Sequence, residues 1–201
     1  MVDLNQNPNE IILWAGKLSI IRLTKKLLTE AKKLYNSYLV KINEYSLTDE
    51  DIAHEFRAFG TNLDRNMKRI NQALTSLLEI SVTADMVDED KRSSYVQKFA
   101  KNLAQYSGQA LHLSKNILDN KRHLDPIAWV STTLRMLASD LSKIATDIQI
   151  MDNQKRIEIP MVDSAGRYVV IEMIKQVSFY IMGNDMTVAR AIEAGEEEEN
   201  S

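Results

Sequence analysis

The sequence contains no cysteine, and this absence excludes several classes of chemistry. A chain without thiols forms no disulfide framework, no thiolate metal site and no cysteine nucleophile. The 201 residues also include only three prolines and six glycines. Because turns depend on these residue types, their scarcity predicts few turns and long secondary-structure elements.

Two further features are missing from the sequence. The first ten residues, MVDLNQNPNE, have neither a basic region nor an apolar one, so they predict no signal peptide. The longest apolar runs are a few residues, far below the roughly 20 that span a bilayer. With 44% apolar and 26% charged residues, the composition is typical of a globular protein. We therefore expect a cytoplasmic protein without a membrane span.

What is present is helical periodicity. Four stretches repeat apolar residues every three or four positions, as an amphipathic helix does. The first expected helix covers about 8–43 and begins at Asn7 and Pro8. The second begins at Thr48, the third at Thr83 or Asp88, and the fourth at Asp125-Pro126. The stripes of the last three are Ile52, Phe56, Phe59, Leu63, Met67, Ile70, Leu74 and Leu77; Val96, Phe99, Leu103, Tyr106, Ala110, Leu113 and Ile117; and Ile127, Val130, Leu134, Leu137, Leu141, Ile144, Ile148 and Met151.

The connections near 44–47, 82–90 and 119–125 are short, which favours antiparallel neighbours. The sequence therefore predicts an all-α protein, an up-down-up-down four-helix bundle over residues 1–153.

After Asn153 the pattern changes. KRIEIPMV and RYVVIEM flank the turn DSAG, which favours a β-hairpin passing into a short helix, together an appendage over 154–194. The alternative is a fifth helix at about 167–182, ended by Gly183-Asn184. Residues 195–201 are expected to form an acidic, disordered tail.

The sequence offers little for catalysis. His54, His112 and His123 fall at unrelated, exposed positions, and no phosphate loop, nucleophile elbow or zinc spacing occurs. HLSK at 112–115 is similar to the surroundings of a phosphotransfer histidine, but Asn116 stands where that motif has glycine. We therefore expect no catalytic residue, no metal and no cofactor, and interpret the chain as not an enzyme.

Two surfaces stand out instead. A basic ridge on the first helix falls within an arc of about 120°, opposite the apolar side. The outer face of the fourth expected helix is rich in small polar residues. The basic ridge is a candidate surface for an anionic partner, and the alternative is an ordinary solvated helix face. The face of the fourth helix is a candidate protein interface, and the alternative is an ordinary polar surface. The ridge comprises Arg22, Lys25, Lys26, Lys32 and Lys33, and the interface Ser131, Arg135, Ser139, Ser142 and Thr146.

These features favour a non-catalytic interaction or assembly protein that binds a protein partner or itself as a homo-oligomer. A nucleic-acid-associated factor using the ridge is the first alternative, although a net charge of −3 argues against it. A bundle enzyme or histidine phosphotransfer protein is the second.

Overall fold

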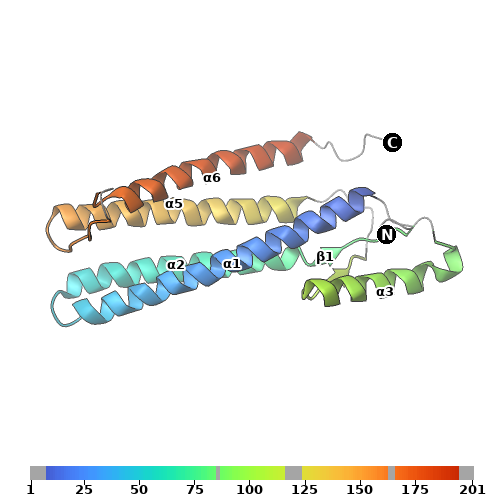
Figure 1. Cartoon of the computed structure of the whole chain (residues 1–201), viewed down its shortest axis with the longest axis horizontal. Coiled ribbons are helices and arrows are strands. Elements are labelled where there is room, and N and C mark those ends of the chain that lie inside the picture. The colour runs from blue at the N-terminus through green and yellow to red at the C-terminus, as the bar shows by residue number, and fades with distance from the viewer. Residues whose placement is uncertain (1–7, 85–86, 116–123, 163–165, 195–201) are drawn as a thin grey trace.

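The computed structural model describes residues 8–84, 87–115, 124–162 and 166–194, and confirms the all-α class. Five helices and one two-stranded parallel sheet make up this part of the chain (Figure 1). The helices are α1 (Pro8–Tyr45), α2 (Glu50–Ser76), α3 (Glu89–Ser107), α5 (Asp125–Asn153) and α6 (Val169–Ala194), and the strands are β1 (Glu79–Ile80) and β2 (His112–Leu113).

Four long helices form a rod in which the chain reverses direction at each step. Helix α1 packs on α2, α2 on α5, and α5 on α6 (Figure 1). Helix α3 and the small sheet lie at one end of this rod. None of the described helices is long and apolar enough to cross a membrane.

The main core lies between α1, α2 and α5, where the stripes predicted for the second and fourth helices meet. All eight stripe residues of α2 are buried, and those of α5 lie in the same cluster. Helix α2 starts one residue later than predicted, because Asp49 rather than Thr48 caps it by accepting a hydrogen bond from the Ile52 N–H at 3.1 Å.

The third predicted helix does not join this core. Helix α3 ends at Ser107, where Gly108 adopts a left-handed conformation with φ of 64°. Tyr106 is 88% exposed, and Leu113 lies in β2, paired with Ile80. Spacing alone missed this ending because the apolar residues beyond the glycine continue the helical period.

Helix α3 instead builds a second core against the start of α1. The rings of Trp14 and Phe99 lie 4.9 Å apart, and the Trp14 indole N–H donates to the Ser81 carbonyl at 3.0 Å. Ile80, Val82 and Ala100 complete the buried part of this cluster. The small sheet closes it, since the Ser114 N–H donates to the Ile80 carbonyl.

The hairpin favoured for the C-terminal segment is wrong. Only a single bridge joins Val162 to Gly166, and Val169–Ala194 is one continuous helix that passes through Gly183. The β-branched residues at its start resemble a strand, but α5 offers them a helical packing surface, and tertiary packing overrides local propensity. The acidic tail, Asn7 and His123 lie outside the described residues.

Candidate functional site

Two chain reversals meet at the end of the rod far from α3. The turn between α1 and α2 and the connection between α5 and α6 both lie there (Figure 1). Arg156 and Asp49 join the two, with 3.9 Å between Nη2 and Oδ1. We refer to this region, centred on Asp152, as the Asp152 corner.

The end of α5 positions the corner. The Lys155 N–H donates to the Asp152 carbonyl and the Arg156 N–H to the Met151 carbonyl, both at 2.9 Å. This pair of bonds is a Schellman ending, with Lys155 in the left-handed region at φ of 61° where glycine is usual. The ending turns the chain back so that its next residues pass over the Asp152 side chain.

The Asp152 carboxylate is the centre of this corner, with a side chain only 2% exposed. It accepts hydrogen bonds from the Ile159 N–H at 2.9 Å, from Arg167 Nη1 at 3.2 Å and from the Tyr168 hydroxyl at 2.6 Å. A buried carboxylate is retained only when it is paired in this way. Asp152 therefore ties the α5–α6 connection to α5.

The same contacts set the protonation states. The hydrogen bond from Tyr168, followed by that from the Ile159 N–H, lowers the pKa of the Asp152 carboxyl. The bond to Asp152 raises the pKa of the Tyr168 phenol. At neutral pH the corner thus holds an ionised carboxylate and a protonated phenol.

Arg167 gives the corner its accessible cation. Its side chain is 37% exposed, and besides Asp152 it contacts Glu158, with 3.5 Å between Nη2 and Oε1. The guanidinium has five N–H groups and these two contacts use two of them, so others are available to a further carboxylate.

The basic ridge lies on the exposed side of α1, and all five of its residues are exposed. Its members are not all free of partners. Lys33 forms an ion pair with Glu30 at 2.7 Å, and Lys32 lies over the Tyr35 ring, 4.5 Å from its centre. Lys25 donates to the Gln109 side chain beyond α3. The role of the ridge toward an anionic partner stays a prediction.

The candidate interface on α5 is partly occupied within the chain. Asp185 of α6 accepts a hydrogen bond from Ser131 at 2.7 Å and forms an ion pair with Arg135 at 2.7 Å. Ser139 is exposed, and Ser142 and Thr146 are half-buried. Whether a partner uses this face also stays a prediction.

The two histidines that the structure describes are not brought together. His54 is exposed on α2, beside Glu50, and His112 is exposed in β2 rather than on a helix. Within residues 8–84, 87–115, 124–162 and 166–194, no group of three or more histidine or acidic residues is placed to hold a metal ion.

Comparison with known proteins identifies the family. A sequence model described as lyase matches residues 50–164, more than half of the chain. The chain belongs to this lyase family. Two relatives are similar over much of the chain: aspartate ammonia-lyase of Bacillus subtilis strain 168 is 27% identical over 99% of it, and that of Escherichia coli K12 is 26% identical over 83%.

The solved structures agree in fold. A fumarate lyase:delta crystallin from Brucella melitensis, in its native form, superposes with a TM-score of 0.84 at 23% identity, over 98% of this chain and 50% of that one. The chain spans about half the length of the curated relatives, since the two matches cover 47% of the Bacillus protein and 38% of the Escherichia protein.

This family corrects the functional interpretation of the sequence. The predictions of a non-catalytic interaction or assembly protein, and of a protein that is not an enzyme, are wrong, because the family and the curated relatives are lyases. The nucleic-acid and phosphotransfer alternatives have no support from the family either. The family model matches residues 50–164, and the Bacillus relative aligns over 99% of the chain at only 27% identity, so a search for short catalytic motifs does not find this relationship.

Proposed function

We propose that this chain is a carbon–nitrogen lyase that eliminates ammonia from a dicarboxylic amino acid such as aspartate. The observation that carries the proposal is the alignment of 99% of the chain with an aspartate ammonia-lyase. The reaction removes a proton from the β-carbon and ammonia from the α-carbon, and a carbon–carbon double bond forms between them. Aspartate thereby yields fumarate and ammonia.

The substrate of this reaction sets a chemical requirement. It carries two carboxylates, which need cations or hydrogen-bond donors to hold them in place. The Asp152 corner supports the proposal because it offers the Arg167 guanidinium and the Tyr168 hydroxyl near the surface. In this proposal Arg167 holds one substrate carboxylate, and Tyr168, whose proton goes to Asp152, positions Arg167 through that shared partner.

The test is an assay of the purified chain with aspartate, following ammonia release and the ultraviolet absorbance of the unsaturated product. We expect activity, and the reverse reaction with fumarate and ammonia. Tyr168→Phe and Arg167→Gln should raise KM, whereas Arg190→Gln, whose arginine pairs with Glu193 near the end of α6, should not. No product from aspartate in either direction would overturn the proposal.

We further propose that the chain acts as a homo-oligomer through the outer face of α6. Val170, Met173, Val177 and Tyr180 are between 44% and 76% exposed and follow one another at spacings of three, four and three. This is the packing pattern of a helix face that meets another helix. We call these four residues the α6 stripe.

The size of the particle tests this proposal. Light scattering across a concentration series should show an oligomer, and Val177→Glu should dissociate it. Gln72→Glu adds the same charge at an exposed position on α2 and should leave the oligomer intact. A monomer at every concentration would contradict the proposal.

A further inference from the structure

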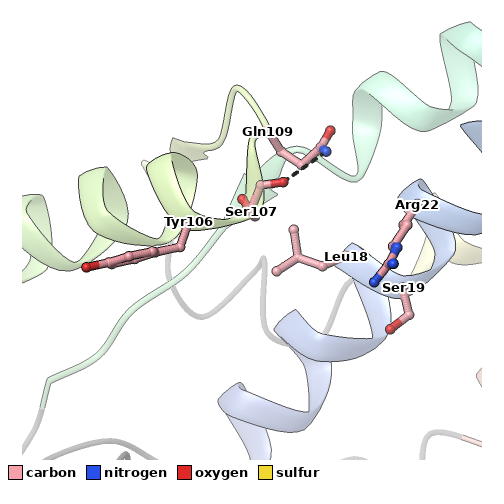
Figure 2. Close-up of a pocket in the computed structure, with 6 residues that line it drawn as sticks. All are labelled: Leu18, Ser19, Arg22, Tyr106, Ser107 and Gln109. Atoms are coloured by element: carbon pink, nitrogen blue, oxygen red, sulfur yellow. Dashed lines mark hydrogen bonds between the residues drawn. The ribbon is translucent and has the colours of Figure 1, made fainter.

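A hollow of about 370 Å³ lies between α1 and the end of α3 (Figure 2). Helix α3 lies at the other end of the rod from the Asp152 corner (Figure 1). Its lining comprises Leu18, Ser19, Arg22, Tyr106, Ser107 and Gln109. Leu18, Ser19 and Arg22 come from α1, and the other three come from the last turn of α3 and the residues after it. None of these six residues carries a carboxylate.

The two segments that line the hollow are also poor in acids. Residues 11–29 contain Lys17, Arg22, Lys25 and Lys26 but no aspartate or glutamate. Residues 104–115, which include the three lining residues from α3 and beyond, contain Lys115 and again no acid. In a chain with a net charge of −3, both segments that line the hollow thus contribute cations and no carboxylate.

Arg22 is available to a ligand. Among the residues that the structure describes, its guanidinium makes no hydrogen bond and no ion pair. Lys25 lies next to the hollow, since its ammonium donates to Gln109 Oε1 at 2.5 Å and keeps further N–H groups. A guanidinium and an ammonium at one hollow suit an anion with two charges.

An alternative role for these cations is to satisfy the carbonyls at the end of α3. Two of those carbonyls already have donors. Ala104 accepts from the Gly108 and Gln109 backbone N–H groups, and Ser107 accepts from the Gln109 side-chain amide at 3.2 Å. The helix end retains only about half a negative charge, less than the charge of the two cations.

We propose that this hollow binds a small dianion through an oxyanion group, a phosphate or a carboxylate, held by Arg22 and Lys25. The planar fork of Arg22 can donate two parallel hydrogen bonds to either group, and Ser19 lies beside it on α1, with Ser107 on the facing side of the hollow. The site is separate from the Asp152 corner and does not depend on the lyase activity.

Isothermal titration of the purified chain with inorganic phosphate and, separately, with succinate tests the site. We expect saturable binding of at least one anion, and the stronger one identifies the group that the hollow prefers. Arg22→Gln should weaken that binding about tenfold or more, the effect of losing a charged hydrogen bond. Gln109→Glu, which adds a carboxylate to the lining, should abolish it.

Lys26→Gln is the matched control, because it removes one charge from the same helix four residues from Arg22 without altering the lining. It should change the affinity less than about threefold, the scale of a screened surface charge. Circular dichroism checks that each variant keeps its helices. Absence of saturable binding of both anions, or equal weakening by Arg22→Gln and Lys26→Gln, would overturn the proposal.

Discussion

Helices α2 and α6 are nearly equal in length and both rich in apolar residues, yet they bury different shares of them. In α2 every apolar stripe residue is enclosed between α1 and α5. In α6 only Ile171 and Ser178 are buried, and Phe179 and Tyr180 are 68% and 76% exposed. Apolar periodicity therefore indicates a helix, but the number of helices packed against it determines how much of its apolar surface is buried.

Removal of α6 should have the largest effect on the molecule. It also tests the predicted division into a bundle over 1–153, an appendage over 154–194 and a tail. The main cluster of buried residues comes from α1, α2 and α5 alone. We expect residues 1–153 to stay helical and to melt cooperatively, at a lower temperature than the full chain. A truncated chain that is unfolded by circular dichroism would show that α6 is needed for folding.

A matched pair of phenylalanines compares the two helices directly. Phe59 in α2 is 4% exposed and contacts the rings of Tyr38 and Phe56, whereas Phe179 lies on the outer side of α6. Phe59→Ala should lower the free energy of unfolding by about 3–5 kcal/mol. Phe179→Ala should change it by less than about 0.5 kcal/mol, measured by urea denaturation at low protein concentration. Equal losses would mean that both helices are buried to a similar extent.

The Asp152 corner makes the attachment of α6 depend on pH. The lowered pKa of Asp152 means that the carboxylate binds its proton less readily in the folded state than in the unfolded state. Its contribution is therefore complete above the ordinary aspartate pKa of about 4 and is lost as the pH falls through the lowered value. Melting curves between neutral pH and about pH 2 should show this loss.

The neutral variant Asp152→Asn provides the control for that pH profile. It should melt at a lower temperature than the unchanged chain at neutral pH, because Arg167 and Tyr168 lose their ionised partner. It should also lose less stability on acidification. If the variant and the unchanged chain have parallel pH profiles, Asp152 is not the group responsible.

A smaller effect, a gain in stability, is expected at Lys155, three residues after Asp152. Lys155 adopts a left-handed conformation that costs a residue with a Cβ atom roughly 1 kcal/mol. Lys155→Gly should therefore stabilise the chain by up to about 1 kcal/mol, less the extra entropy of glycine in the unfolded state. Lys143→Gly, inside α5, should destabilise it by a similar amount.

These regions also differ in how far the sequence predicts them. The apolar stripes of α2 and α5 were predictable, because each helix has one apolar face and that face is the buried one. The end of α3 was not, since it depends on Gly108 and on β2 pairing with β1, 33 residues earlier. Helix α6 was missed because its opening Val169-Val170-Ile171 has strand-like propensity, which packing on α5 overrides.

The sequence did not predict either candidate site, because each joins residues that are far apart in the chain. The Asp152 corner joins a helix end to Arg167 and Tyr168, 15 and 16 residues later, through a reversal that no turn motif announces. The hollow joins Arg22 to Gln109 across most of the first half of the chain. What the sequence did contain was the cluster of basic residues on α1, and the structure adds the acid-free segment that faces part of it.

The smallest effect on stability is expected along the basic ridge. Lys25, Lys26, Lys32 and Lys33 are all exposed, so changing the four to glutamine should alter the free energy of unfolding by less than about 1 kcal/mol. If the ridge serves an anionic partner, the variant should elute from a heparin column at lower salt than the unchanged chain, because fewer charges attract the polyanion. Reversing the test, Glu30→Gln releases Lys33 from its ion pair and should raise the salt needed for elution. Elution of all three proteins at one salt concentration would show that the ridge is a solvated face.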